Sequence, residues 1–272
     1  MKILSIITIN KNNAVGLKKT IQSVICQTYT DFEYIIIDGV SEDGSVEIIR
    51  KYIDNINYWI SEPDTGIYNA MNKGILKAQG EYCLFLNSGD WLVSPETIDN
   101  VFREISGNPS DIFYSDRINC NNTIVRYPNK LTIDFLLNTS ISHQNTLIKR
   151  SLFLEHGLYN EELRISSDKE FFLSEFWKYK SVFYHIDTNI AFFDIHGIGS
   201  QKSKARFAEH VIVYKNVFQE LANMVIENHN FRNTIYYYIM MDSADTKLLI
   251  CSLRIYRMLF KIAKHIFSIF KN

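Results

Sequence analysis

Several apolar segments in the first half of this 272-residue sequence are followed at once by polar or acidic side chains. In CLFLNSGDWL, residues 83–92, an apolar run ends in Asn87 and Asp90. One carboxylate can suffice for Mg²⁺, which keeps several waters and often takes only one or two protein carboxylates together with phosphate oxygens. Ser, Gly and Asp are also favoured in turns that bind nothing. The segment therefore predicts either a cation site or a plain turn.

The segment DGVSEDGS, residues 38–45, also begins where an apolar run ends. Gly39 and Gly44 have the spacing of a P-loop, but Ser45 stands where that motif needs a lysine for the phosphates, so we exclude a P-loop. Asp38 can still accept hydrogen bonds from a ribose or from the imide N–H of a base. An Asx-turn that closes the loop explains the same residue equally well.

The predicted helix at 67–78 carries an unusual polar face. Asn69, Asn72 and Lys73 lie at i, i+3 and i+4, which places them on one side of the helix. Surface helices more often carry Glu and Lys, because Asn is a poorer helix former. This face therefore indicates contact with a polar ligand, with an ordinary solvated face as the alternative.

Asp168 stands near the start of a predicted helix at 167–179. A helix N-terminus favours the ionised carboxylate, which is the form that a general base requires. Capping of the helix is the more common role of an Asp at this place. His143 and Gln144 precede an apolar run, and His196 lies in a glycine-containing segment. A lone histidine is more often structural than catalytic, so each is a weaker candidate for substrate contact.

The elements that must position these residues alternate along the chain. Apolar runs without polar alternation are separated by segments of helical spacing, a pattern typical of a parallel sheet covered by helices on both faces. In such sheets ligands bind at the carboxyl ends of the strands, which is where the polar residues stand. We expect strands at 3–9, 34–37, 57–61, 82–86, 111–115 and 183–193, and helices at 17–27, 45–53, 67–78, 95–105, 167–179 and from about 205 onward.

Composition narrows the classes of function. The 29 Lys and Arg residues nearly balance the 30 Asp and Glu residues, so no basic field indicates nucleic acid. The four cysteines are far apart and form no C-x-x-C pair, which argues against zinc and a disulfide framework and fits a reducing, cytoplasmic compartment. No apolar run reaches the length of about 18 residues that predicts a spanning helix.

The last segment, residues 247–271, contains no acidic residue. Arg254, Arg257, Lys261 and Lys264 recur every three or four residues among Leu, Ile and Phe, which predicts a basic amphipathic helix. Helices of this kind lie on anionic lipid surfaces. Packing against the rest of the chain or against a second subunit of an oligomer is the alternative.

These motifs occur in an order that resembles family 2 glycosyltransferases. The resemblance covers roughly residues 2–200 and is carried by SIITINKNNAVGLKKTIQSVICQTYTDFEYIIIDGVSEDGS and by SEPDTGIYNAMNKGILKAQGEYCLFLNSGDWL. The second segment is closer to a bacterial subgroup that acts in capsule, O-antigen and exopolysaccharide assembly. The resemblance implies an α/β fold of the GT-A type at 1–204, with a nucleotide-sugar half at about 1–116, an acceptor half at about 117–204 and a helical extension at 205–272.

The resemblance also implies roles for residues that bind the donor. The positions near the nucleotide are matched by Thr8, Asn10, Asp38, Asp64 and Lys73, with Asp38 at the base. NSGD stands at the acidic metal motif of the family, where Asp90 matches the last carboxylate and would hold Mg²⁺ or Mn²⁺. Asn87 replaces the first acid of that motif and would bind the ribose.

The remaining matches concern the acceptor side. Asp168 matches the acidic residue that acts as catalytic base, and His143 and Gln144 fall in the acceptor region. His196 is a weaker match, as a second metal ligand, because the family more often has other residues there.

The implied activity is an inverting transfer of a sugar from a nucleotide-sugar, a UDP-sugar by resemblance. The acceptor would be a hydroxyl of a glycan or of a lipid-linked molecule in surface polysaccharide synthesis, at the inner face of the plasma membrane. A sugar nucleotidyltransferase, the first alternative, needs a glycine-rich basic loop after the first strand, whereas TINKNNAVG has one glycine. The second alternative, a non-catalytic nucleotide-binding protein of the membrane surface, is disfavoured because Asp38, Asp90 and Asp168 occur together.

Overall fold

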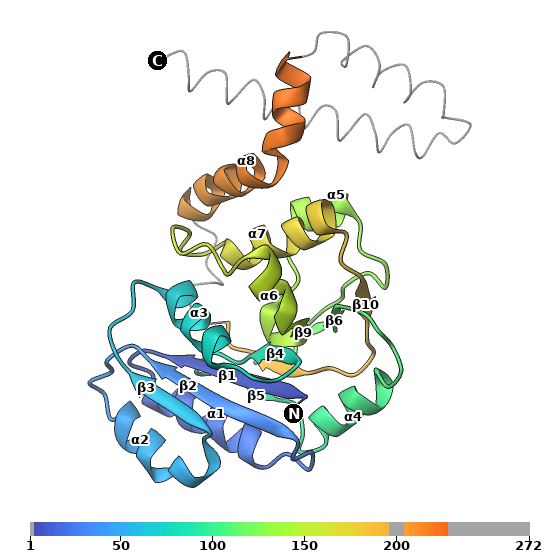
Figure 1. Ribbon diagram of the computed structural model, residues 1–272. Coiled ribbons are helices and arrows are strands. Elements are labelled where there is room, and N and C mark those ends of the chain that lie inside the picture. Colours follow the sequence, from blue (N-terminus) through green and yellow to red (C-terminus); the bar gives the residue numbers. More distant parts are fainter. Residues whose placement is uncertain (1–2, 196–203, 228–272) are drawn as a thin grey trace. The chain divides into compact units, whose positions relative to one another are not determined.

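The computed structural model describes residues 3–195 and 204–227 of the chain. The chain is divided into two compact units, residues 1–203 and residues 204–272, and each is described by itself (Figure 1). The first unit contains every residue singled out above except the basic stripe at 247–271. That stripe and His196 lie outside the described residues.

A seven-stranded sheet forms the centre of the first unit, in the order β10-β6-β9-β4-β1-β2-β3. Strand β9 is antiparallel to both of its neighbours, β4 and β6, while the other six strands share one direction. The carboxyl ends of those six strands therefore meet at one edge of the sheet. The strands are β1 (Leu4–Asn10), β2 (Phe32–Asp38), β3 (Tyr58–Ser61), β4 (Tyr82–Phe85), β6 (Ile112–Tyr114), β9 (Thr146–Lys149) and β10 (Phe183–His185).

Helices cover both faces of this sheet, as the unalternated apolar strands predict. On one face, α1 (Ala14–Ile25), α2 (Ser45–Lys51) and α4 (Thr97–Glu104) share an apolar cluster with the inward side chains of the strands. On the other face lies α3 (Ile67–Lys77) (Figure 1). A Cβ atom at Gly74 would stand 2.4 Å from Cγ2 of Ile7, so this glycine lets α3 pack directly on β1.

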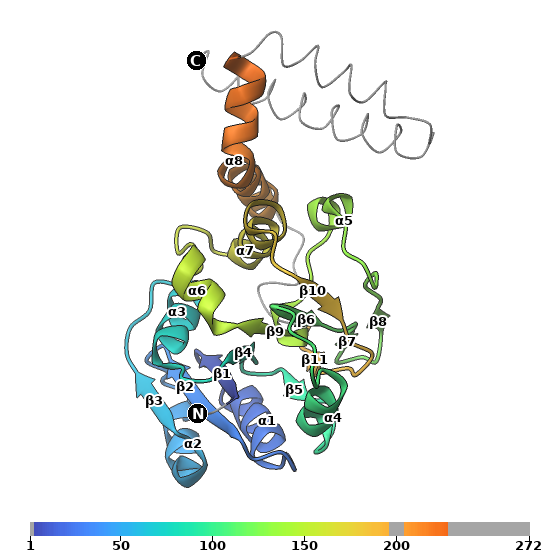
Figure 2. The ribbon, with the colours of Figure 1, turned by 45° about the vertical axis from the view of Figure 1, so that its right-hand side comes forward.

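The rest of the first unit is built around a second, four-stranded sheet and shorter helices. Its order is β5-β11-β7-β8, and Figure 2 shows β7 and β8 beside β6 and β10. The strands are β5 (Trp91–Leu92), β7 (Arg117–Asn119), β8 (Ile124–Val125) and β11 (Ala191–Phe193). The helices are α5 (Ile133–Asn138), the 3-10 turn η2 (His143–Asn145), α6 (Arg150–His156) and α7 (Ser167–Ser174), which continues into the π-helical turn η3 (Glu175–Tyr179).

One expectation about the second half was wrong. The apolar run at 183–193 is not one strand, because β10 and β11 belong to different sheets. The polar residues between them turn the chain: the backbone N–H groups of Asp187 and Thr188 donate to the carboxylate of Glu104, at 2.7 and 3.0 Å. The sheet is mostly parallel, as expected, while the short strand β9 enters it in the opposite direction.

In the second unit, the described residues form one long helix, α8 (Lys204–Glu227), with non-helical backbone angles at Phe218. The part of the chain that the structure describes contains no helix long and apolar enough to cross a bilayer.

Candidate active site

The polar ends of β1, β2 and β3 meet at Asp38. In the sheet register, Asp38 lies opposite Asn10 on one side and Ser61 on the other. Its carboxylate is fully buried and accepts four hydrogen bonds, from the side chains of Asn10 (2.7 Å) and Ser61 (2.6 Å), and from the hydroxyl and N–H of Ser41 (2.6 and 2.9 Å). A carboxylate offers about four lone-pair directions, so Asp38 fixes the loop at 39–44 and leaves the backbone of that loop to meet a ligand.

The electrostatics of Asp38 follow from these bonds. Burial by itself raises the pKa of the carboxyl, but the donors Ser41, Ser61 and Asn10 together outweigh burial, and the pKa lies below its ordinary value. Thr8, two residues before the strand end, is fully buried, and its Oγ1 lies 3.0 Å from the hydroxyl of Tyr34. The structure thus places the Thr8 hydroxyl in the core rather than at the strand ends.

Asp64 and Lys73 flank the turn between β3 and α3. A Cβ atom added to Gly39 would stand 2.2 Å from Oδ2 of Asp64, so this carboxylate lies against the start of the loop after β2. Lys73 Nζ pairs with Glu62 Oε1 at 2.8 Å and donates to the carbonyl of Pro63 at 2.7 Å. Both side chains are partly exposed beside the Asp38 loop, where a ligand at the strand ends can reach them.

The two asparagines that share a face with Lys73 have a structural partner. Asn72 is buried, exchanges hydrogen bonds with the backbone of Tyr159 (2.8 and 3.0 Å), and donates to Glu161 Oε1 at 2.8 Å. Asn69 donates to Glu161 Oε2, also at 2.8 Å. This part of the polar face, which we considered a ligand contact, anchors the loop that leads into α7.

Asp90 follows a turn in which Gly89 has a φ of +109°. The Asp90 side chain is buried, with 2% of the residue exposed, and its Oδ1 accepts the N–H of Asp194 at 2.8 Å. A Cβ atom at Gly89 would lie 2.8 Å from Oδ2 of Asp194, which brings a second carboxylate to the same turn. Burial is the main cause that raises the pKa of Asp90, and the charge of Asp194 acts in the same direction. Hydrogen bonds from Asp194 N–H and Gln144 and the charge of His143 partly oppose them, and the resulting pKa is about 6.

The donors around this turn fit a hard divalent cation. Asn87 Oδ1 is a buried amide oxygen without a hydrogen-bond donor, and the Asp90 carboxylate is costly to ionise in its present surroundings. Oxygen ligands of this kind suit Mg²⁺ or Mn²⁺, which would complete its shell with water and phosphate oxygens. Within residues 3–195 and 204–227, no cluster of three or more His, Cys, Asp or Glu side chains forms a closed metal site by itself.

Asp168 is linked to the strand end of β4 through His143. His143 Nδ1 lies 3.2 Å from Asp168 Oδ2, and His143 Nε2 lies 3.3 Å from Asn87 Nδ2. His143 Nδ1–H donates to the Asp168 carboxylate, while Nε2 faces the side-chain amide of Asn87. The other oxygen of Asp168 accepts from the Tyr68 hydroxyl (3.0 Å) and from Lys169 N–H (2.8 Å).

These donors keep Asp168 in its basic form. Burial raises the pKa of the carboxyl, but the hydrogen bond and charge of His143, followed by Lys169 N–H and Tyr68, outweigh burial and lower the pKa below its ordinary value. The side chain remains 18% exposed. Asp168 is also not the N-cap of α7, because Ser166 occupies that position. An ionised, accessible carboxylate with fixed orientation is a suitable general base.

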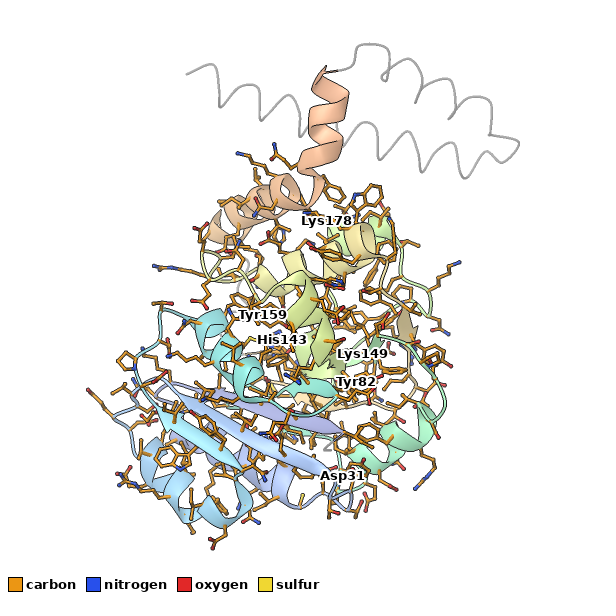
Figure 3. The ribbon with its side chains drawn as sticks, viewed as in Figure 1. Asp31, Tyr82, His143, Lys149, Tyr159 and Lys178 are labelled. Carbon is orange, nitrogen blue, oxygen red and sulfur yellow. The ribbon has the colours of Figure 1, made fainter. Side chains whose placement is uncertain are left out.

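The turn η2 joins the base to the proposed metal ligand. His143 contacts Asp168, while the next residue, Gln144, hydrogen-bonds Asp90. The ring of Phe85 lies edge-on to the rings of both His143 and Tyr159, which packs the turn against β4. His143 and Tyr159 are labelled in Figure 3. The structure therefore gathers Asn87, Asp90, His143, Gln144 and Asp168 into one constellation. A second group, Asn10, Asp38, Asp64 and Lys73, surrounds the ends of β1–β3.

Sequence reasoning missed Asp194 and Tyr68. Asp194 directly follows the apolar pair Phe192 and Phe193, so the strand-end signal that identified Asp38 and Asp90 is also present there. Tyr68 gave no such signal, because a tyrosine near the start of a helix is ordinary. Its approach to Asp168 depends on how α3 and α7 meet, which is a tertiary property.

Comparisons with known proteins identify relatives of this chain. The model of a family described as "Glycosyl transferase family 2" matches residues 5–193. An uncharacterized glycosyltransferase of Mycobacterium tuberculosis is 34% identical over 206 residues, which cover 73% of this chain and 78% of that protein. A PGL/p-HBAD biosynthesis glycosyltransferase of Mycobacterium bovis is 34% identical over 172 residues, which cover 61% of this chain and 67% of that protein.

Solved structures show the same fold at low sequence identity. Residues 1–349 of S. aureus TarS in complex with UDP give a TM-score of 0.63 at 19% identity, over 79% of this chain and 66% of that one. The mannosyltransferase PcManGT of Pyrobaculum calidifontis, in complex with GDP-Man and Mn²⁺, gives a TM-score of 0.56 at 12% identity, over 92% of this chain and 73% of that one.

Proposed function

Because this chain belongs to glycosyl transferase family 2 and has the GT-A fold, we propose that it moves a sugar from a UDP-sugar to a hydroxyl of an acceptor glycan or lipid-linked molecule, with inversion at the anomeric carbon. The observation that carries the proposal is the ionised, accessible carboxylate of Asp168, held by His143 in the same constellation as Asp90. The complexes of TarS with UDP and UDP-GlcNAc support the choice of donor.

The donor would bind at the carboxyl ends of β1–β4, in the half formed by residues 1–116. Asn10 and the loop fixed by Asp38 would meet the base and ribose, with Asp64, Lys73 and Asn87 around the nucleotide. Asp90, with Asn87 Oδ1 and Asp194 close by, would hold Mg²⁺ or Mn²⁺, which supplies positive charge for the diphosphate leaving group. The acceptor would lie in the half formed by residues 117–204.

In the transfer, the acceptor oxygen forms a bond to the anomeric carbon while the bond from that carbon to the diphosphate oxygen breaks. Asp168 takes the proton of the acceptor hydroxyl, for which it must come within about 3 Å of that oxygen. His143 and Tyr68 orient the two carboxylate oxygens and stabilise the ionised base before the acceptor arrives. The attacking oxygen and the leaving group must then stand on opposite faces of the sugar, which gives inversion.

The experiment that tests this function is a panel of UDP-, GDP-, CDP- and TDP-sugars with Mn²⁺. One nucleotide class should raise the melting temperature of the full chain, because a ligand that binds the folded state alone stabilises it. The same class should release nucleoside diphosphate on incubation. If no member of the panel binds or releases nucleotide, the proposed function is wrong.

We further propose a role in bacterial surface glycan or glycolipid assembly, with the protein held at the inner surface of the membrane by residues 247–271. The name of the M. bovis relative supports the first part, and the basic stripe in the sequence supports the second. The full chain should sediment with vesicles containing anionic phosphatidylglycerol and lose this binding in high salt. Equal sedimentation with neutral phosphatidylcholine vesicles would contradict the electrostatic part.

A further inference from the structure

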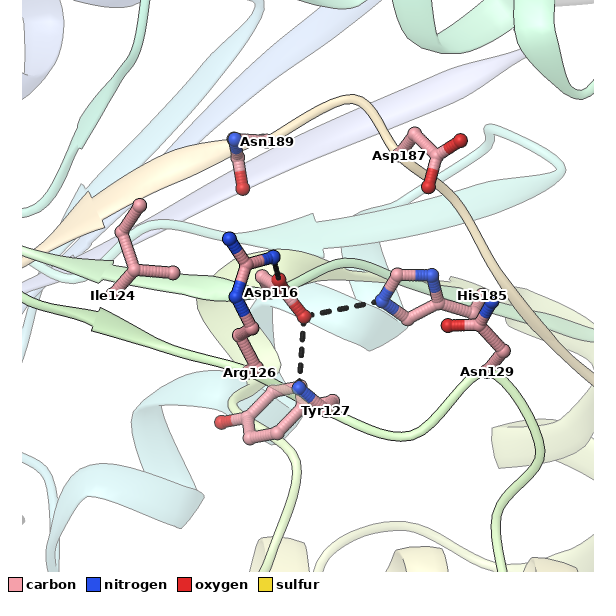
Figure 4. Close-up of a pocket in the computed structure, with 8 residues that line it drawn as sticks. All are labelled: Asp116, Ile124, Arg126, Tyr127, Asn129, His185, Asp187 and Asn189. Carbon is pink, nitrogen blue, oxygen red and sulfur yellow. Dashed lines mark hydrogen bonds and ion pairs between the residues drawn. The ribbon is translucent and has the colours of Figure 1, made fainter.

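A second polar cavity, of about 260 Å³, lies at the carboxyl ends of the outer strands of the large sheet (Figure 4). Its floor is formed by Asp116, the second residue after the end of β6, and by His185, the last residue of β10. The carboxylate of Asp116 accepts the N–H of Tyr127 at 2.8 Å, lies 3.2 Å from His185 Nε2, and pairs with Arg126 at 3.4 Å. None of these residues belongs to the constellation around Asp168.

Both walls of this cavity are tied to the turn that carries His143. The N–H of Ser115, beside the floor residue Asp116, donates to the backbone carbonyl of Asn145 at 3.0 Å. The N–H of Ala191, two residues after the wall residue Asn189, donates to Asn145 Oδ1, also at 3.0 Å. Asn145 is the last residue of η2, whose first residue contacts Asp168. The cavity is therefore held in a fixed relation to the proposed base.

The lining of the cavity suits an uncharged, hydroxylated ligand. In Figure 4, Asn189 points toward the Asp116–Arg126 pair, and Asp187 lies on the same side of the cavity, above His185. Amide, carboxylate and guanidinium groups can donate to or accept from adjacent hydroxyl groups. Ile124 and Tyr127 also line the cavity and give it an apolar part, which suits the C–H face of a sugar ring. The cavity is lined by the carboxylates of Asp116 and Asp187 and by the one guanidinium of Arg126. The resulting excess of negative charge disfavours a phosphate or a carboxylate ligand.

The size of the cavity limits the ligand further. Since one water takes about 30 Å³ in the liquid, the cavity has room for about eight or nine waters. That space accepts one sugar ring, whose hydroxyl groups would replace those waters, and is below the range of about 300–1,000 Å³ common for larger ligands.

We propose that this cavity binds an uncharged sugar unit of the acceptor, next to the unit whose hydroxyl meets Asp168. The proposal rests on the proposed function, because it requires a glycan acceptor. The side chain of Arg126 is 82% exposed, so it stands at the rim and can fold over a bound sugar, whereas Asp116 and His185 stay fixed below it. The cavity then selects the acceptor, while the ends of β1–β4 select the donor.

The test is saturation-transfer NMR on the full chain with neutral methyl glycosides, namely those of glucose, galactose, mannose, rhamnose and N-acetylglucosamine. At least one should bind in the millimolar range, and Arg126→Ala and Asn189→Ala should each weaken that binding about tenfold or more. Arg103→Ala is the matched control, because this arginine is likewise exposed and pairs with a carboxylate, that of Asp99, but lies outside the cavity. It should leave glycoside binding unchanged.

Binding of UDP and of the nucleotide-sugar panel is measured on the same samples. If a nucleotide-sugar binds and no glycoside does, or if both cavity variants bind glycosides as the wild type does, the acceptor cavity is wrong and the proposed function stands. If glycosides bind through Arg126 and Asn189 but no nucleotide-sugar binds, the cavity is a sugar site and the proposed function is wrong.

Discussion

Replacing Asp90 by asparagine should make the metal-free protein more stable at pH 8. The folded carboxyl titrates at about 6, against 3.8 as its ordinary value, chiefly because it is buried. Between these pH values the folded protein retains a proton that the unfolded chain has lost, so the free energy of unfolding falls as pH rises. Above pH 6 the folded state carries the full cost of the buried charge. Asparagine has nearly the same shape and no charge to bury.

The magnitude follows from the same two values. The pKa of Asp90 is about two units higher in the folded protein than in the unfolded chain. At about 1.4 kcal/mol for each unit, ionised Asp90 lowers the free energy of unfolding at pH 8 by about 3 kcal/mol. Asparagine keeps an oxygen for the N–H of Asp194 but alters the contact with Gln144, so a net gain of about 2 kcal/mol at pH 8 is expected. The gain should shrink between pH 6 and pH 4 and vanish below.

The assay is urea denaturation at pH 4, 5, 6, 7 and 8 in EDTA, repeated at pH 8 with UDP and Mn²⁺. In EDTA the variant should be more stable than the wild type at pH 8, whereas UDP and Mn²⁺ should stabilise only the wild type substantially. Equal or lower stability of Asp90→Asn at pH 8 in EDTA would refute the reasoning that the Asp90 charge is kept at a cost to folding.

Two further predictions concern the residues that position the base. His143→Ala should shift the acidic limb of the rate profile to higher pH, with a loss of about tenfold on that limb, because a charge-assisted hydrogen bond of about 1.5 kcal/mol to the proposed base is lost. His156→Ala removes a histidine that contacts Glu175 rather than Asp168, so it should leave the limb in place. An unshifted limb in a folded His143→Ala protein would contradict the role of His143. Asn72→Ala should lower the free energy of unfolding, measured in urea, by about 2–4 kcal/mol, because three hydrogen bonds of a buried amide are lost. Asn69→Ala, which loses an exposed hydrogen bond to Glu161, should lower the free energy of unfolding by less than about 1 kcal/mol. Equal losses in the two variants would contradict buried anchoring by Asn72.

The first half of the fold could be predicted from local pattern. Strands β1 to β4 are short apolar runs with unalternated polarity, and each is followed by a polar residue that turns the chain. Helices α1 to α4 have apolar positions at helical spacing, so periodicity and turn chemistry point to the same elements. Because the carboxyl ends of parallel strands meet at one edge of the sheet, the sequence also predicts that Asn10, Asp38 and Asp90 lie at that edge.

The second half depends on tertiary contacts that leave little local trace. The division of 183–193 into β10 and β11 rests on Glu104, which lies in α4, far away in sequence. The four-residue strand β9 is too short to show a period, yet it separates β4 from β6 in the sheet. The pairing of His143 with Asp168 likewise joins residues that sequence reasoning proposed separately, and only the docking of η2 against α7 makes them one unit.

The most direct test of the central claim is the rate of sugar transfer by Asp168→Asn. Asparagine keeps the shape of the side chain and removes its ability to take a proton, so kcat should fall by about a hundredfold to ten-thousandfold. Binding of the nucleotide-sugar, followed by thermal shift, should remain as in the wild type, because the proposal assigns Asp168 to the acceptor and not to the nucleotide. A folded Asp168→Asn protein that transfers sugar at the wild-type rate would contradict the assignment of Asp168 as the general base.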